Sequence, residues 1–121
     1  MAVRASLTGR LVIATLHAAS PVESLRRLID FKLKLSDFIP SLLGVFSQRL
    51  VRRKEGEKYT HRFPLTEYIF FNEDLKNRIT QANAIVDFQL EQTFRDSAQN
   101  ALEKQLTDVA EIRRVLGHEC I

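Results

Sequence analysis

The chain has 121 residues, of which 45% are hydrophobic and 27% charged, and its formal net charge is +3. This length and composition suit one soluble globular domain with its own core. No apolar run approaches the ~20 residues of a membrane-spanning helix, and the first residues lack a signal peptide's apolar core, so we expect a cytoplasmic protein. The sequence has a single cysteine, Cys120, which excludes an internal disulfide. With only three scattered histidines beside it, we expect no zinc site.

Residues 10–16 predict the first strand, because they are rich in Leu, Val, Ile and Thr. The turn residues Thr8 and Gly9 precede this run, and His17 stands where it stops. Open α/β folds bind ligands at the carboxyl edge of a sheet. The pattern therefore predicts that the His17 imidazole lies at such an edge.

A helix is predicted to begin at Pro21, which suits a first helical position. Ser20 can cap this helix, and Glu23 stands where it would complete a capping box. Apolar residues then recur at helical spacing on one face: Val22, Leu25, Leu28 and Ile29.

A second, largely buried helix is predicted from Ser36 to about Val51, with Pro40 in its first turn and apolar residues on more than one face. Basic residues gather near its end: Arg49, Arg52, Arg53 and Lys54. Such a cluster can attract nucleic acid or acidic lipid. Glu55 and Glu57 follow at once, and basic residues in a last turn complement the helix dipole. We favour this structural interpretation over nucleic-acid binding.

The second half of the chain predicts one strand and several helices. Residues 62–71 are expected to form the strand, with Pro64 at an edge, and Asn72 to cap a short helix. Thr107 and Asp108 are expected to open a last helix, which Gly117 ends. A longer helix is predicted between the short helix and the last one. Its candidate buried positions are Ile85, Phe88, Phe94, Ala98, Ala101 and Leu102.

The segment Thr8-Gly9-Arg10-Leu11-Val12-Ile13-Ala14-Thr15-Leu16-His17 resembles the histidine box of the ATPases that power type II secretion and type IV pilus assembly. In that family the box reads roughly T-G-H-L-V-x-S/T-T-L-H, on a strand near the γ-phosphate of the nucleotide. The resemblance implies nucleotide sensing by four residues: Thr8, Gly9, Arg10 and His17. Arg10 replaces the first histidine, and its guanidinium offers a cation that does not titrate near neutrality. Two interpretations of His17 stay open, a nucleotide sensor and a strand end bonded to solvent or backbone.

Further family landmarks follow in the same order. Residues 23–30 resemble the A-I-x-R-L-x-D-M helix, and residues 41–53 resemble the S-L-x-x-V-x-A-Q-R-L-V-R-x-L segment most closely. Residues 62–71 resemble the G-R-x-x-I-x-E-x-L strand, with Glu67 at its acidic position. Residues 108–117 resemble the terminal T-L-E-E-V-L-R-V-x-G helix. The similarity thus spans nearly the whole chain.

The resemblance implies an α/β fold, the C-terminal portion of a RecA-like ATPase domain. In it, one or more strands pack with several helices. Residues 1–121 would form a single partial domain. Residues 1–71 would be a remnant of the ATPase core with the histidine-box strand, and residues 72–121 a C-terminal helical subdomain.

The phosphate-binding motif G-x-x-x-x-G-K-S/T is absent from the sequence. The family's aspartate box and second acidic motif would lie upstream of Met1. Phosphoryl transfer depends on positioning and charge neutralisation by these parts. The resemblance therefore predicts a fragment that by itself has no cofactor and does not hydrolyse ATP. The full-length members of the family use ATP and Mg²⁺. The family's zinc-binding cysteine pairs are also missing after Arg53.

The resemblance implies two kinds of partner, the other subunits of a homo-hexamer and an inner-membrane platform protein. The location would be cytoplasmic, peripheral association with the inner membrane being one option. Arg4, Arg49 and Arg62 are candidate interface residues. The alternative function is a small non-enzymatic helical interaction module that docks through exposed apolar faces.

Overall fold

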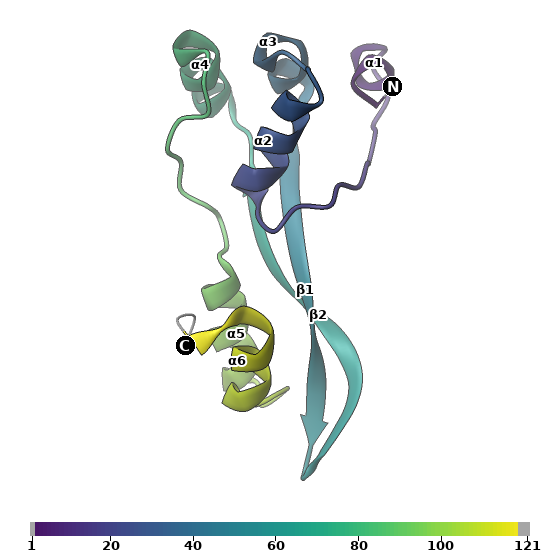
Figure 1. Cartoon of the computed structure of the whole chain (residues 1–121), viewed down its shortest axis with the longest axis vertical. Coiled ribbons are helices and arrows are strands. Elements are labelled where there is room, and N and C mark those ends of the chain that lie inside the picture. Colours follow the sequence, from purple (N-terminus) through teal and green to yellow (C-terminus); the bar gives the residue numbers. More distant parts are fainter. Residues whose placement is uncertain (1, 119–121) are drawn as a thin grey trace. The chain divides into compact units, whose positions relative to one another are not determined.

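The computed structural model describes residues 2–118, so Cys120 lies outside the described residues. Figure 1 shows several helices and one two-stranded sheet, a mixed α/β structure as predicted. In chain order the elements are α1 (Ala2–Leu7), α2 (Pro21–Asp30), α3 (Leu35–Phe38), the 3₁₀ helix η1 (Ile39–Ser41), β1 (Gly44–Glu55), β2 (Lys58–Phe70), α4 (Glu73–Ala82), α5 (Phe94–Glu103) and α6 (Val109–Leu116). None of these helices has both the length and the apolar character needed to span a bilayer.

The described residues divide into two compact units. Unit 1 comprises residues 2–45 and 69–89, and unit 2 comprises residues 46–68 and 90–118. These boundaries differ from the expected division between residues 1–71 and 72–121. The expected division into an ATPase-core remnant and a helical subdomain stays a prediction.

The start of α2 confirms the predicted Ser20 cap and the place of Pro21, but the predicted capping box is not formed, because Glu23 bonds to the Ala19 amide and not to that of Ser20. The Ser20 hydroxyl accepts a hydrogen bond from the Glu23 amide at 3.2 Å, and Pro21 takes the first helical position. The Glu23 carboxylate accepts from the Ala19 amide at 2.7 Å. Two of the unpaired amides of the helix entry are thereby satisfied.

Helix α2 contributes to the buried core of unit 1. An edge contact between the Phe71 and Phe88 rings, with centroids 6.3 Å apart, borders this core. The buried hydrophobic residues of unit 1 are Leu25, Leu35, Phe38, Ile39, Ile69, Phe71, Leu75 and Ile79.

The predicted strand at residues 10–16 is wrong for this structure, in which the segment is irregular and exposed. Leu11 and Ile13 keep 76% and 88% of their surface accessible. A strand needs a neighbour for its N–H and C=O groups, and the strands of the described residues, β1 and β2, pair with each other. Sequence preference alone therefore does not make this segment a strand.

The predicted helix from Ser36 to Val51 is also wrong beyond its first turns. Pro40 lies in η1, and β1 begins at Gly44. Glycine is a poor helix residue, whereas the Val and Phe residues that follow favour a strand. Apolar residues on several faces suit either structure, and the pairing with β2 decides for the strand.

The strand predicted at residues 62–71 is confirmed, although β2 begins earlier, at Lys58. The long helix predicted through Ile85 and Phe88 is wrong in its first half, because residues 84–90 are not helical. The short helix predicted after Asn72 is confirmed as α4, which ends at Ala82 and is followed by Asn83 with a left-handed φ of +49°. Helix α5 begins after Thr93, which forms a capping box with Asp96. The last helix is confirmed as α6.

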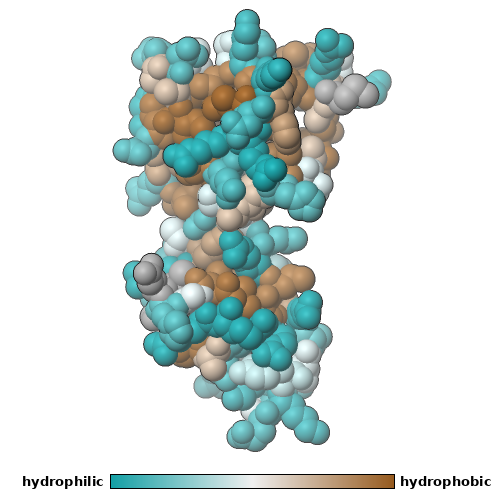
Figure 2. Space-filling model, in the orientation of Figure 1, coloured by the Kyte–Doolittle hydropathy of each residue, from teal (hydrophilic) through white to brown (hydrophobic). Residues whose placement is uncertain are grey.

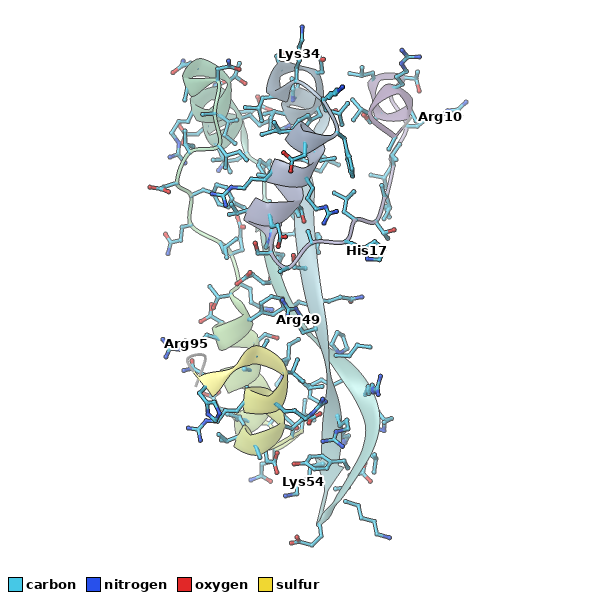
Figure 3. The ribbon with its side chains drawn as sticks, viewed as in Figure 1. Arg10, His17, Lys34, Arg49, Lys54 and Arg95 are labelled. Carbon is cyan, nitrogen blue, oxygen red and sulfur yellow. The ribbon has the colours of Figure 1, made fainter. Side chains whose placement is uncertain are left out.

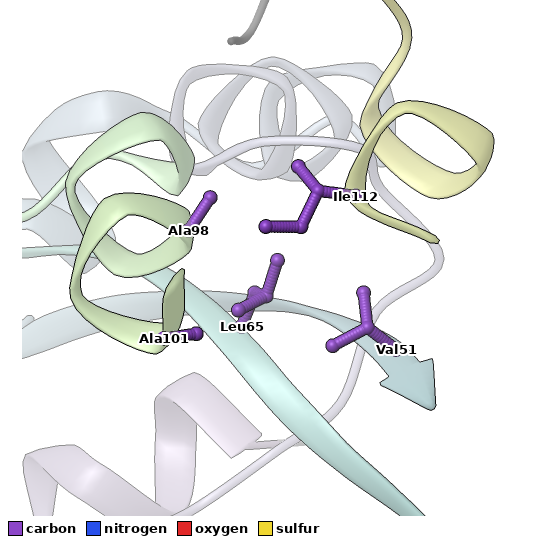
Figure 4. Close-up of a cluster of buried hydrophobic side chains, with 5 residues drawn as sticks. All are labelled: Val51, Leu65, Ala98, Ala101 and Ile112. Atoms are coloured by element: carbon purple, nitrogen blue, oxygen red, sulfur yellow. The ribbon is translucent and has the colours of Figure 1, made fainter. Parts of the chain in front are cut away.

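The core of unit 2 lies between the hairpin and the two C-terminal helices, as Figure 4 shows. Phe63, Phe94, Leu102, Leu106, Val115 and Leu116 pack around it. Ala98 and Ala101 are small, so α5 can approach the strands closely. The five central side chains are Val51, Leu65, Ala98, Ala101 and Ile112.

The C-terminal segment also covers both outer edges of the hairpin in unit 2. At β1, the Lys54 amide donates to the Leu106 carbonyl at 2.9 Å, and Thr107 Oγ1 donates to the Arg52 carbonyl at 2.7 Å. At β2, the Tyr68 amide donates to the Gln92 carbonyl at 2.9 Å. These bonds satisfy edge groups that would otherwise be open to pairing with another strand.

Candidate functional site

The histidine-box segment begins at the end of α1. Thr8 Oγ1 donates to the Ala5 carbonyl at 2.7 Å, and the Gly9 amide donates to the Ser6 carbonyl at 3.1 Å. Gly9 has a φ of +85°, a left-handed conformation that glycine adopts without steric cost. Thr8 and Gly9 therefore end a helix and turn the chain into the exposed segment.

Arg10 and His17 stand at opposite ends of that segment, and both are exposed. Figure 3 shows the Arg10 side chain beside α1 and the His17 side chain farther along the same irregular segment. Neither has a hydrogen-bond or ion-pair partner within residues 2–118. The structure therefore does not bring the Arg10 and His17 side chains together, and their role in nucleotide sensing stays a prediction.

The three candidate interface arginines have different surroundings. Arg4 on α1 and Arg62 on β2 are exposed. Arg49 is half-buried, and its guanidinium carbon lies 5.6 Å from the centre of the Phe94 ring. A contact of this kind stabilises unit 2 from within. An interface role for any of the three stays a prediction.

The basic cluster of Arg49, Arg52, Arg53 and Lys54 lies on β1, so its predicted place at a helix end is wrong. Its polar partners nevertheless support the structural interpretation. Arg52 binds Glu111 of α6 through its backbone amide at 2.6 Å, its Nε at 3.0 Å and its Nη2 at 2.9 Å. Arg114 binds the same carboxylate at 2.6 and 3.0 Å.

These donors surround a carboxylate whose side chain has no accessible surface. The guanidinium groups of Arg114 and Arg52 hold the pKa of Glu111 far below its usual range. Burial alone would raise this pKa. The charged form is therefore stabilised by its hydrogen bonds, and a carboxylate with such a low pKa is no general base at neutral pH.

A second ionic group joins β1, β2 and the start of α6. Lys54 Nζ donates to Asp108 at 2.9 Å, and the Tyr59 hydroxyl donates to the same carboxylate at 2.8 Å. The hydrogen bond from Lys54 is the main cause that lowers the pKa of Asp108. The bond to Asp108, with burial, raises the pKa of Tyr59. The Arg52 guanidinium also lies 4.2 Å from the centre of the Tyr59 ring.

Sequence reasoning missed this ionic network. It identified Asp108 as the start of a helix, and the Asp108 side chain does accept from the Glu111 amide at 2.9 Å. Only the spacing of Glu111 and Arg114, three residues apart on a helix, signals one of its pairs. No group of acidic, histidine or cysteine side chains that could hold a metal ion occurs in the part of the chain that the structure describes.

Comparison with known proteins identifies the family. Residues 1–115 match the family model described as type II/IV secretion system protein. A stretch of 53 residues, 44% of this chain, is 51% identical to the type II secretion system protein HxcR of Pseudomonas aeruginosa and covers 11% of that protein. The type II secretion system ATPase E of Vibrio cholerae is 50% identical to this chain over 52 residues. The type IV pilus assembly ATPase PilB of Thermus thermophilus is 45% identical over 53 residues.

These matches cover 43% and 44% of this chain, and 10% and 6% of the respective relatives. The matched stretch thus spans about a tenth or less of each curated relative. The family model, in contrast, covers nearly the whole of the present sequence. The chain belongs to the type II/IV secretion system protein family.

Proposed function

We propose that this chain supplies part of an ATPase that powers type II secretion or type IV pilus assembly. The observation that carries the proposal is the family match over residues 1–115. Two of the relatives are named as ATPases of these systems. In this proposal the 121 residues correspond to the C-terminal part of a RecA-like domain, working in a hexamer at an inner-membrane platform protein.

The histidine-box segment acts on nucleotide in this proposal only when other residues complete the site. The sequence of this chain has no phosphate-binding motif. Residues 10–18 form no hydrogen bond within the described part of the chain, and the apolar side chains of Leu11 and Ile13 are exposed. A strand from outside these residues would satisfy the backbone groups and bury the side chains. Pairing of this kind would fix Arg10 and His17 on one strand.

The decisive test is a chimera. The histidine box of the Vibrio cholerae ATPase E is replaced by residues 8–17 of this chain, and ATP hydrolysis is measured. We expect the chimera to hydrolyse ATP, and His17→Ala to lower kcat by about tenfold or more, equivalent to ~1.4 kcal/mol of transition-state stabilisation. Arg10→His, which restores the family's residue, should retain activity, and Ile13→Val is the matched conservative control.

Equal hydrolysis by the chimera and its His17→Ala variant would contradict a sensing role for His17. A calorimetric titration of the 121-residue chain with ATP and Mg²⁺ provides a second arm. We expect no binding by the chain or by its His17→Ala variant. Micromolar binding that is lost in the variant would show a complete nucleotide site and refute the proposed dependence on other residues.

The exposure of Leu11 and Ile13 also favours a second candidate, a non-enzymatic interaction module. Apolar side chains at such exposure promote association. This function predicts association that ATP does not change, whereas a segment of an ATPase should associate with its partner subunits in a nucleotide-dependent way. Sedimentation of the chain together with the remainder of the ATPase, with and without ATP, separates the two.

A further inference from the structure

Unit 1 contains an open depression of about 620 Å³ that none of the proposed roles uses. It lies between the second half of α2, the start of α3 and the residues that follow α4. Figure 2 shows apolar residues gathered over the helices of unit 1 and bordered by hydrophilic side chains. The lining residues are Arg26, Ile29, Leu33, Lys34, Leu35, Ser36, Asn83, Ala84 and Ile85.

The polar side chains of this lining are hydrogen-bond donors, and none is a carboxylate. Arg26 and Lys34 have no ion-pair partner within residues 2–118. Lys34 stands at the start of α3 (Figure 3). The lining carries two cationic side chains, Arg26 and Lys34, and no carboxylate, so its formal charge is +2. The depression therefore attracts an anionic group.

Its other lining residues are apolar and continue onto an exposed surface. Ile29 lines the depression and is 37% exposed, and Phe31 at the end of α2 is 58% exposed. A site for a small molecule encloses most of its ligand, which an open depression does not. A bilayer surface is broad, whereas the depression is a single hollow with two cationic side chains. A protruding pair of side chains from another protein fits both the shape and the chemistry.

We propose that this depression is a docking site for an acidic peptide segment of a partner protein, in which a carboxylate stands beside an apolar side chain. The carboxylate binds Arg26 and Lys34, and the apolar side chain packs against Ile29 and its apolar neighbours. Charge complementarity of this kind speeds association and sets specificity. The assignment does not depend on nucleotide binding.

The test measures fluorescence anisotropy of a labelled hexapeptide of alternating Glu and Leu with the 121-residue chain. We expect binding that weakens with salt and falls by about tenfold or more in the Arg26→Glu/Lys34→Glu double variant. The matched control is Lys104→Glu/Arg113→Glu, which makes the same charge change at exposed positions of unit 2. It should keep affinity within about twofold, since neither of its residues lines the depression.

Amide chemical shifts provide a readout that survives if the double variant unfolds. In the unaltered chain, the peptide should shift the amides of Ser36 and Asn83 more than those of unit 2. Three outcomes would overturn the proposal. These are no peptide binding, equal loss in the folded control, and equal binding of a Lys-Leu peptide. Displacement of the peptide by inorganic phosphate alone, or binding of phosphatidylglycerol vesicles without peptide binding, would also overturn it.

Discussion

Replacing Glu111 tests the view that buried ionic contacts hold α6 to β1. In Glu111→Ala the Arg52 amide loses its acceptor, and both guanidinium groups lose a carboxylate. A buried donor without a partner costs about 1–3 kcal/mol. Breaking a buried ion pair costs about 3–5 kcal/mol when the remaining charge cannot reach water.

Both arginines can reach water, because the Arg52 and Arg114 side chains are 37% and 54% exposed. The cost of about 3–5 kcal/mol for breaking an ion pair therefore does not apply in full. From the unpaired Arg52 amide and the lost contacts of the two guanidinium groups together, we expect Glu111→Ala to lower the free energy of unfolding by about 2–4 kcal/mol. Glu111→Gln keeps one carbonyl oxygen that can accept from the Arg52 amide, so its cost should be about 1–2 kcal/mol.

The assay is urea unfolding followed by far-ultraviolet circular dichroism, together with amide hydrogen exchange. Exchange at Arg52 and Lys54 reports opening of the outer edge of β1 directly. Glu103→Gln, which changes an exposed carboxylate of α5, is the control and should stay within about 0.5 kcal/mol of the unaltered chain. If Glu111→Ala also stays within that range, the ionic contacts do not stabilise this unit and our reasoning is refuted.

Two further predictions concern the stability of the chain in acid and the contrast between the buried side chain of Leu65 and the exposed side chain of Leu11. The pKa of Glu111 is lowered in the folded chain, chiefly by Arg114, and that of Asp108 chiefly by Lys54. The unfolded chain therefore binds more protons as pH falls through about 4, and stability should be complete above about pH 5 and decline below it. Glu111→Gln should flatten this decline in unfolding curves taken from pH 6 to pH 3, and an unchanged slope would contradict the assignment. Leu65→Ala should cost about 2–5 kcal/mol in urea unfolding, because Leu65 is buried in the core of unit 2. Leu11→Ala should cost less than about 0.5 kcal/mol because Leu11 is 76% exposed, and an equal cost would show that residues 10–16 are packed in solution.

The sequence by itself determined the family and the helix ends that depend on local contacts. The order of motifs pointed to the secretion and pilus-assembly ATPases, and the match over residues 1–115 bears this out. Ser20, Asn72 and Asp108 were recognised as helix starts, because a capping side chain bonds to an amide only three residues away. Such short-range geometry is visible in any sequence window.

Only the tertiary structure decided which apolar segments became strands. Residues 10–16 have strand-forming side chains but no neighbouring strand within the described residues, so they stay irregular. Residues 44–51 had the spacing of a buried helix, yet they pair with β2 over a long hairpin. The contact of Glu111 with Arg52, 59 residues apart, is equally invisible to local patterns. Strand pairing and buried ion pairs depend on partners distant in sequence, and the fold alone brings those partners together.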